Sequence, residues 1–522
     1  LLPNDTDFSE FKSAGIPGMN FAYIGGITSY HTQLDTPANL DQRSLQHQGL
    51  YALSLARHFG NAGSEYGGAN EAVYFKPVNG FFVSYSRVWV IPLTLLTAAF
   101  LITIVVLGLK RKLFTASGII LGFLAQLLSA AVAWGAGTVI WLALRGKADG
   151  WMYKPHFFAI GFVVLTIGLF VALYILFSRK ISLHSLAAGA MLLWLVLLTA
   201  VTIYMPGASY LFAWPLLLGA LALAAVTLYS RERPAWVYLV LMLCAVPTLL
   251  LWSQTLHQIY QAMTLNVVGP LMAVVALVCG LLLPQFGLLS RRQLWLIPAT
   301  GALLCIAFLV AGFSSSKFDE ERPKMNSIFY VMNADTNQAV WASVDEVRDE
   351  WTSQYLVGNT VKGSLIDYLP LTYRGFTIAS APLTSLAAPE AVLLADTTTN
   401  GARTLRLHVR SGRRAPFVTV DVGPGTELRR ALLDDKPLGG ILSEPRRDAD
   451  IGWTLWHHTV SDDGLKLTLE TAAGRPLKIR VTDRTAGLPQ LPSVKNIPRP
   501  EHIMRAPYPY SDTTSISKTF TF

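Results

Sequence analysis

A tyrosine, a histidine and an aspartate stand close together near the start of the chain, in the sequence YHTQLDT of residues 30–36. The neutral imidazole of His31 is a good zinc ligand, and a carboxylate four residues later, Asp35, could orient that ring or order the loop. Tyr30 stands directly before the histidine. Taken alone, the pattern His-Thr-x-x-Asp is weak. A loop histidine hydrogen-bonded to a turn aspartate is the favoured interpretation of these residues by themselves.

The flanking sequence predicts the elements that would position this loop. Residues 19–26, MNFAYIGG, predict an apolar strand that ends in two glycines, where the chain can turn without a Cβ penalty. Asp41 is predicted to be the N-cap of a helix whose apolar residues recur at helical spacing. This helix is predicted to end at Gly60 and Asn61. The loop 27–40 therefore follows the carboxyl end of a strand, where open α/β sheets place their ligand sites.

The overall composition indicates a membrane protein. Of 522 residues, 52% are hydrophobic and 14% charged, and the mean hydropathy is +0.41. Ordinary soluble domains carry about 25% charged residues. The net charge of +9 is typical of lysines and arginines that face the cytoplasm, so no nucleic-acid partner is expected. The three cysteines lie in apolar runs, which predicts buried thiols and no disulfide.

Eight apolar segments are long enough to cross a bilayer, which takes about 20 residues. They are residues 88–109, 116–144, 157–177, 185–205, 209–229, 235–256, 264–286 and 294–313. None contains an acidic or basic residue in its core. Since ion-coupled transporters need ionisable groups there, a transporter is disfavoured. Gln126, Gln254 and His257 are interpreted as packing or interfacial residues, and the bundle as an anchor or scaffold.

Positive charges in the loops between these segments predict the orientation. The odd-numbered loops hold nine lysines and arginines and the even-numbered loops hold three, so the odd loops are expected in the cytoplasm. With eight crossings, residues 1–86 and the tail after 314 would both lie on the outer or lumenal face. Residues 72–86 predict a hairpin around Asn79 and Gly80 that leads into the first membrane segment.

The region 314–522 is predicted to be a β-rich domain, with an antiparallel sandwich as the expected architecture. TLRLHVR and LKLTLE alternate apolar and polar residues with the period of two that marks half-buried strands. The arginine pairs 413–414, 429–430 and 446–447 are interpreted as solvated faces. The residues after Pro489 are expected to wrap over the domain. His457 and His458 are not expected to share a metal, since adjacent strand residues point to opposite faces.

The chain is expected to be a fragment that begins inside a domain. It opens Leu1-Leu2-Pro3 without a signal peptide. Residues 1–86 also lack the repeated strand–helix units of a whole α/β domain. The predicted organisation is therefore the C-terminal part of an α/β domain in 1–86, an eight-helix transmembrane domain in 87–313 and an extracytoplasmic or lumenal β-rich domain in 314–522.

Residues 15–60, from GIPGMNFAYIGG to SLARHFG, resemble the closing segment of the di-zinc aminopeptidase and glutamate-carboxypeptidase-like peptidases. The likeness is closest to their membrane-bound branch, which includes vacuolar membrane protease and endoplasmic reticulum metallopeptidase. The order of peptidase domain, eight membrane helices and lumenal β-rich tail is similar to that branch. The ending of the chain, from GLPQLPSV onwards, also resembles its bacterial members. The resemblance thus covers essentially the whole chain.

The resemblance implies roles for individual residues. His31 would be the last zinc ligand, Tyr30 would support the tetrahedral oxyanion with its hydroxyl, and Asp35 would hold the loop or the imidazole. Asp7 would belong to a segment near the site. However, Phe8 stands where the family has a histidine, and this puts a direct role for Asp7 in doubt. The histidines at 47 and 58 are interpreted as structural.

The expected function is that of a membrane-anchored, zinc-dependent exopeptidase, which would hydrolyse peptide bonds with water activated by two zinc ions. The family's other ligands and its Glu general base, which belong to upstream sequence, have no counterpart in this chain. The chain as given is therefore expected to bind zinc weakly or not at all and to be inactive. The alternative is a peptidase-like scaffold or receptor that has lost its metals. The intact His31 favours the enzyme. Substrate, exopeptidase direction and oligomeric state are not indicated.

Overall fold

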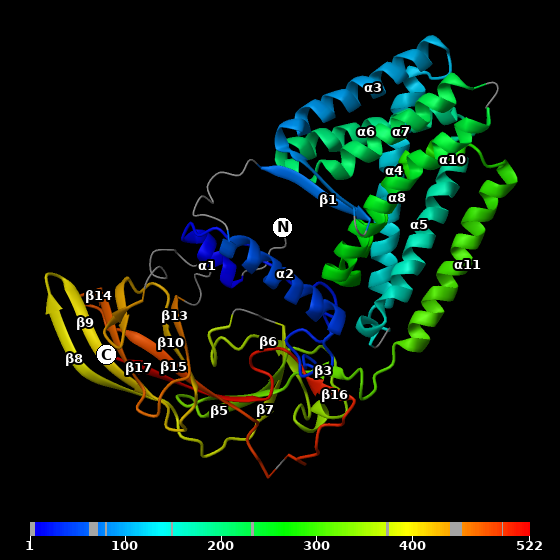
Figure 1. Ribbon diagram of the computed structural model, residues 1–522. Coiled ribbons are helices and arrows are strands. Elements are labelled where there is room, and N and C mark those ends of the chain that lie inside the picture. The colour runs from blue at the N-terminus through cyan, green and yellow to red at the C-terminus, as the bar shows by residue number, and fades with distance from the viewer. Residues whose placement is uncertain are drawn as a thin grey trace. The chain divides into compact units, whose positions relative to one another are not determined.

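The computed structural model describes residues 6–61, 71–78, 81–147, 150–230, 234–371, 375–438, 452–492 and 494–522 (Figure 1). The chain divides into two compact units with the main boundary between Lys317 and Phe318. The first unit is almost entirely helical. The second consists of β-sheets.

The first unit begins with two helices and a hairpin and continues as a helical bundle. Its elements are α1 (Asp7–Ser13), α2 (Gln42–Asn61), β1 (Ala72–Val78), β2 (Phe81–Ser86), α3 (Val90–Lys110), α4 (Ala116–Leu144), α5 (Pro155–Phe177), α6 (Leu183–Tyr204), α7 (Tyr210–Leu228), α8 (Ala235–Met263), α9 (Val268–Leu281), α10 (Leu283–Phe286) and α11 (Arg291–Ser315). As predicted, β1 and β2 pair antiparallel. The turn expected at Asn79 and Gly80 lies outside the described residues.

Within the described residues, seven helical stretches are long and apolar enough to cross a membrane. They are Arg87–Lys110, Ala116–Leu144, Pro155–Phe177, Leu183–Tyr204, Tyr210–Leu228, Ala235–Leu281 and Arg292–Ser315. The predicted count of eight is not confirmed. The predicted segments 235–256 and 264–286 fall largely within one stretch of 47 residues, Ala235–Leu281.

This long stretch turns back on itself. Helix α8 ends at Met263, and Thr264 has a φ of 55°, outside the helical region. In α10, Gln285 Nε2 donates a hydrogen bond of 2.9 Å to the carbonyl of Leu241 in α8. Residues after the turn therefore return beside the first half of α8. The returning arm is divided between α9, of 14 residues, and the short α10, so neither reaches the length of about 20 residues that a bilayer requires.

Glycines allow the helices to approach closely where they cross. A Cβ added to Gly189 in α6 would lie 2.3 Å from the backbone nitrogen of Phe123 and 2.4 Å from the carbonyl oxygen of Ile119, both in α4. At the crossing of α5 and α11, a Cβ on Gly301 would lie 2.9 Å from the carbonyl oxygen of Val164. Membrane helices associate through such packing because lipid supplies no hydrophobic drive between them.

Several hydroxyl groups inside the bundle are paired within their own helices. Thr97 Oγ1 donates to the carbonyl of Leu93 at 2.8 Å, and Thr166 Oγ1 donates to the carbonyl of Phe162 at 2.7 Å. Each bond connects residues four positions apart. These side chains thus need no partner from lipid, where an unpaired polar group is costly.

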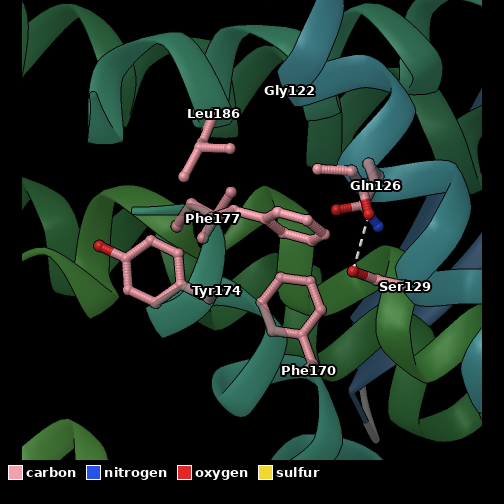
Figure 2. A pocket seen from close by; sticks show the side chains of 9 residues that line it. Gly122, Gln126, Ser129, Phe170, Tyr174, Phe177 and Leu186 are labelled. Carbon is pink, nitrogen blue, oxygen red and sulfur yellow. Dashed lines mark hydrogen bonds between the residues drawn. The ribbon is translucent and has the colours of Figure 1, made fainter. Parts of the chain in front are cut away.

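Gln126 connects two helices across the bundle. It is 3% exposed, and its Nε2 donates to the carbonyl of Ala276 in α9 at 3.1 Å, which agrees with the prediction of a packing residue. It lines a pocket of about 20 Å³ together with Phe170 and Tyr174 of α5 and Leu186 of α6 (Figure 2). That volume holds about one water molecule.

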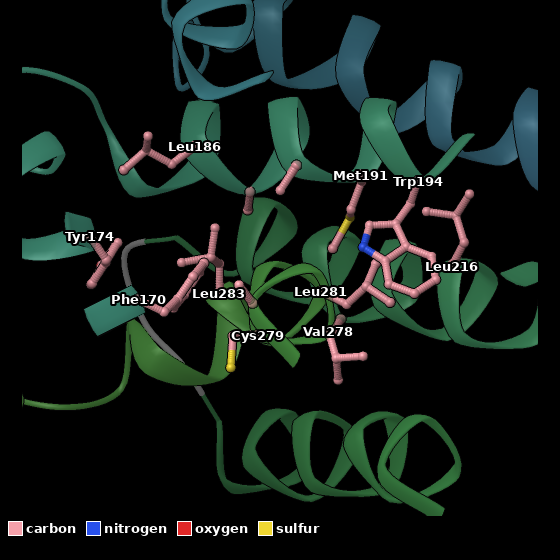
Figure 3. Packing of buried hydrophobic residues seen from close by; sticks show 14 of the residues in the cluster. Phe170, Tyr174, Leu186, Met191, Trp194, Leu216, Val278, Cys279, Leu281 and Leu283 are labelled. Carbon is pink, nitrogen blue, oxygen red and sulfur yellow. The ribbon is translucent and has the colours of Figure 1, made fainter. Parts of the chain in front are cut away.

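The centre of the bundle is a continuous apolar cluster (Figure 3). Trp194 and Met191 of α6 are fully buried there, with Leu216 of α7. The indole Nε1 of Trp194 donates to the carbonyl of Leu277 at 2.9 Å and thereby joins α6 to α9. The three thiols are free and buried, as predicted: Cys244, Cys279 and Cys305.

The second unit contains two large sheets and a two-stranded one. Its strands are β3 (Lys324–Asn326), β4 (Phe329–Asn333), β5 (Gln338–Ser343), β6 (Val361–Gly363), β7 (Phe376–Ala381), β8 (Glu390–Thr399), β9 (Ala402–Arg410), β10 (Phe417–Val422), β11 (Leu428–Leu433), β12 (Lys436–Pro437), β13 (Trp453–His458), β14 (Leu465–Ala472), β15 (Lys478–Ala486), β16 (Ile503–Arg505) and β17 (Thr513–Thr521). The larger sheet has the order β13-β10-β15-β17-β4-β5-β7-β6, and the smaller has the order β12-β11-β14-β9-β8.

The two large sheets share one apolar core. Leu405, Leu407 and Val409 of β9 are fully buried, and they lie in one cluster with Val420 of β10 and Val481 of β15. The predicted alternation of β9 and β14 is confirmed, since the intervening residues are more exposed. Burial of each such side chain stabilises the fold by about 1.5–3 kcal/mol.

The prediction of an antiparallel sandwich needs correction. Strand β17 pairs antiparallel with β15 but parallel with β4, so the larger sheet is mixed. The end of the chain was expected to wrap over the domain, yet Thr513–Thr521 lies inside the sheet between β15 and β4. Its threonines and serines are strand-compatible, and Ser515 and Ile516 are fully buried.

One arginine pair differs from its predicted role. The Arg413 side chain is 9% exposed, and its Nη2 lies 2.6 Å from Oδ1 of Asp483, which is fully buried. Burial raises the pKa of Asp483, and the neighbouring Arg413 opposes that shift. Arg413 is therefore an internal ion-pair partner and not part of a solvated face. Arg414 is 79% exposed, as predicted, and residues 446–447 lie outside the described residues.

The α4–α6 crossing makes a first prediction. Gly189→Ala should destabilise the bundle by about 1–3 kcal/mol, because the added methyl group meets backbone atoms that cannot move aside. Gly135→Ala is the matched control, since its Cβ would meet nothing within 4 Å. Thermal unfolding in detergent measures both variants. Equal midpoints for the two would contradict the close contact between α4 and α6.

The buried ion pair makes a second prediction. Arg413→Ala should destabilise the β-rich unit by about 3–5 kcal/mol, because it leaves the Asp483 carboxylate buried without its cation. Arg414→Ala should change stability by less than about 1 kcal/mol, as expected for an exposed pair. Denaturant unfolding of the two variants tests this. A similar effect of both substitutions would show that burial of the pair is unimportant.

Candidate functional site

The loop that carries the candidate ligands is a run of turns. Ser29 N donates to the carbonyl of Gly26 at 2.9 Å, and Thr36 N donates to the carbonyl of Leu34 at 2.9 Å. Asn39 Nδ2 donates to the same Leu34 carbonyl at 2.8 Å. The loop is thus held by its own backbone on both sides of His31.

His31 adopts an uncommon backbone conformation. Its φ is 59°, in the left-handed region, where residues other than glycine occur in only a few per cent of cases. Tyr30, His31 and Asp35 all lie exposed in this run of turns, with Tyr30 at 62%. The loop therefore presents an imidazole, a phenol and a carboxylate on the surface of the described residues.

Asp7 lies in a separate short element. It is the first residue of α1, directly after Thr6. Asn20 Nδ2 donates to Thr6 Oγ1 at 3.2 Å. Phe8 packs on Gly18, where an added Cβ would lie 2.5 Å from the Phe8 ring. Phe8 thus makes a packing contact.

The predicted strand 19–26 does not form among the described residues, which corrects that part of the predicted α/β fragment. The segment has no regular secondary structure, and its apolar residues Phe21, Tyr23 and Ile24 are 44–53% exposed. A strand needs a neighbour to pair its backbone groups, and the sheets of the described chain contain no strand from this segment.

The helix after the loop forms as predicted. Asp41 caps α2, with Oδ1 accepting from the backbone N–H of Arg43 at 2.8 Å and of Ser44 at 3.2 Å. The Arg43 guanidinium, with help from these N–H groups, holds the pKa of Asp41 well below its usual range. The helix continues through Gly60 to Asn61. This helix therefore fixes the C-terminal end of the loop.

No residue of α1 or α2 is buried. Helix α2 nevertheless carries large apolar side chains, and Leu45, Leu50 and Leu53 are 46–50% exposed. Tyr51 stacks on Phe21 at 5.0 Å between ring centroids. Apolar side chains exposed together in this way mark contact sites.

The described residues do not by themselves make a two-zinc site. They contain no group of three or more His, Cys, Asp or Glu close enough to hold a metal ion. The loop offers one imidazole, His31, and one nearby carboxylate, Asp35. A bound zinc ion takes at least three protein ligands, so these residues could supply only part of such a site.

The family model of peptidase family M28 matches residues 1–56, which include α1 and the whole loop. This match supports a peptidase at the level of the family. No curated protein and no solved structure matches the chain.

Two polar features of the β-rich unit escaped prediction from sequence. One is the Arg413–Asp483 pair, whose members are 70 positions apart. The other is a pocket lined by Asp421, Lys478 and Arg480. The sequence did indicate one part of this pocket. Lys478 and Arg480 lie two positions apart in a strand, so both face the same side of β15. The pairing of β15 with β10 was not readable from the sequence.

The cap of α2 makes a third prediction. Asp41→Ala should speed hydrogen exchange at the amides of Arg43 and Ser44, since both lose their acceptor. Because the pKa of Asp41 is lowered, the cap should persist at neutral pH and be lost only as the pH falls through that lowered pKa. Hydrogen exchange followed by mass spectrometry measures this. Asp35→Ala is the control, and an equal effect from it would refute the assignment of Asp41 as the cap.

Proposed function

We propose that this chain is part of a membrane-anchored, zinc-dependent exopeptidase in which His31 is a zinc ligand. The observation that carries the proposal is the match of residues 1–56 to a peptidase family, with His31 in the turn-rich loop between α1 and α2. The apolar helices supply the anchor. Two zinc ions would activate a water molecule for hydrolysis of a peptide substrate.

The exposed apolar surface of residues 19–27 and α2 supports a larger peptidase domain. Side chains such as Met19, Ile24 and Leu50 are about half exposed, and burying the remaining half of each in a domain core would gain roughly 0.8–1.5 kcal/mol. We infer that this surface packs against further polypeptide, which also brings the other zinc ligands and the general base to His31. Asp35 then has the role of ordering the loop, and Tyr30 that of supporting the oxyanion.

We further propose that both flanking regions lie on the same side of the membrane. Arg111 Nη1 lies 3.4 Å from the carbonyls of Thr227 and Leu228, and Ser182 Oγ donates to the carbonyl of Leu113 at 3.2 Å. The first, third and fifth loops therefore share one end of the bundle. If the two arms on either side of Thr264 both cross the membrane, there are eight crossings. The odd-numbered loops, which hold most of the lysines and arginines, would then face the cytoplasm.

A fourth prediction tests the enzyme. In the protein expressed from its complete reading frame, His31→Ala should lower the zinc content and abolish hydrolysis of fluorogenic aminoacyl substrates. Asp35→Asn should reduce zinc affinity or activity by roughly 10–100-fold, as changes to partners of metal ligands do. Elemental analysis and initial rates measure the two effects.

His58→Ala is the matched control, because His58 lies on α2 with its ring against Phe59 and should leave both quantities unchanged. Zinc and activity that survive His31→Ala would refute the ligand assignment. A protein that folds but neither binds zinc nor hydrolyses peptides would instead favour the scaffold or receptor.

A fifth prediction tests the topology. Single cysteines at Glu10 and Lys466 should react with a membrane-impermeant maleimide from the same side, while one at Lys110 should react only after permeabilisation. The three native cysteines are buried and give a low background. Labelling of Glu10→Cys and Lys466→Cys from opposite sides would mean an odd number of crossings and overturn this arrangement.

A further inference from the structure

The pocket in the β-rich unit lies on the face of the larger sheet that is opposite the shared apolar core. In the strand register, Asp421 of β10 is opposite Arg480 of β15, and Arg480 is opposite Thr519 of β17. Paired residues point to the same side of a sheet. These three residues therefore form one polar row, and together with Lys478 they line a pocket of about 240 Å³.

The walls of this pocket are held in place. Asp421 is 6% exposed. The Arg480 guanidinium donates to the carbonyl of Ile366, and Ile366 and Pro370 form another side of the pocket. The backbone from Leu365 to Leu369 is closed by a hydrogen bond of 2.7 Å. An arginine has five N–H donors, so Arg480 can still bind a ligand while it fixes this segment.

The same face continues as a buried polar layer. The hydroxyls of Thr454 and Thr482 are buried and lack a hydrogen-bond partner within the described residues. Arg484, 8% exposed, lies between the rings of Phe417 and Tyr510, with its Cζ 4.8 and 4.5 Å from their centroids.

Within the described part of the chain no carboxylate forms an ion pair with Arg484, and its Nη1 has no hydrogen-bond partner. Buried polar groups are normally paired. A layer with several unpaired donors is therefore suited to a polar guest or to ordered water.

The charge of the pocket selects the class of ligand. Lys478 and Arg480 contribute two positive charges and Asp421 one negative charge, which leaves one cation in excess. Arg484 adds a further positive charge on the same face of β15. The volume far exceeds the roughly 10–15 Å³ that one water needs and suits a small molecule.

We propose that this pocket binds a small organic anion through a carboxylate or phosphate group. Lys478 and Arg480 hold the oxyanion by charge-assisted hydrogen bonds, and the Thr519 hydroxyl contributes a further donor. Asp421 orients Arg480 and excludes ligands with a second negative charge deep in the pocket. The site is independent of the peptidase loop.

The test is a titration of the purified chain with three probes: glycerol phosphate, inorganic phosphate and the dipeptide glycylglycine. Isothermal titration calorimetry at constant ionic strength should show saturable binding of at least one of them. Binding of the phosphates alone assigns a phosphorylated ligand, and binding of the dipeptide alone assigns a carboxylate. The absence of saturable binding by all three overturns the proposal.

Variants locate the binding site. Lys478→Glu should weaken binding by roughly tenfold or more, and the fold should be retained because Lys478 is exposed. Arg480→Gln should do the same, with folding checked by its unfolding midpoint. Lys466→Glu, an equal charge reversal at an exposed position in the smaller sheet, should leave the affinity unchanged. An affinity unaffected by Lys478→Glu, or equally weakened by Lys466→Glu, contradicts the site.

Discussion

The helical unit depends on close packing between long apolar helices that are consistent with a membrane protein. The hydroxyls of Thr97 and Thr166 donate to carbonyls one turn earlier. The side chains of Trp194 and Gln126 donate to carbonyls of α9. Because the cores of these helices carry no Asp, Glu, Lys or Arg to form ion pairs, the helices associate through close packing of complementary surfaces. Gly189 lets α6 touch the backbone of α4. The candidate spans are thus closely packed, and their apolar cores contain no Asp, Glu, Lys or Arg.

The β-rich unit is organised around a different constraint, which is the burial of apolar side chains between its sheets. Apolar side chains of β9, β10, β14 and β15 fill one core, while the opposite face of the larger sheet holds buried polar residues. Asp483 shows how a charge is tolerated at full burial, with Arg413 beside it. Asp421 and Arg480 are opposite each other in the strand register and both border a pocket.

Local patterns were predictable from the sequence, and long-range pairings were not. Apolar runs predicted the helices, Asp41 predicted the start of α2, and alternation predicted β9 and β14. A break between the segments 235–256 and 264–286 was predicted, but α8 continues to Met263, because hydropathy does not report the backbone angle at which a helix ends. The strand at 19–26 was predicted from its apolar composition, but a strand also needs a neighbour. The place of β17 beside β4, and Arg413 beside Asp483, depend on contacts between distant segments.

The loop between α1 and α2 carries the candidate zinc ligand, His31. It presents His31 in a left-handed turn, in a segment that matches a peptidase family and adjoins an exposed apolar surface. The most direct measurement is anomalous diffraction at the zinc edge from crystals of the protein together with the further polypeptide inferred to pack on that surface. The account predicts a zinc ion about 2.0–2.1 Å from a ring nitrogen of His31. Zinc bound elsewhere, with the His31 ring outside its coordination shell, would contradict it.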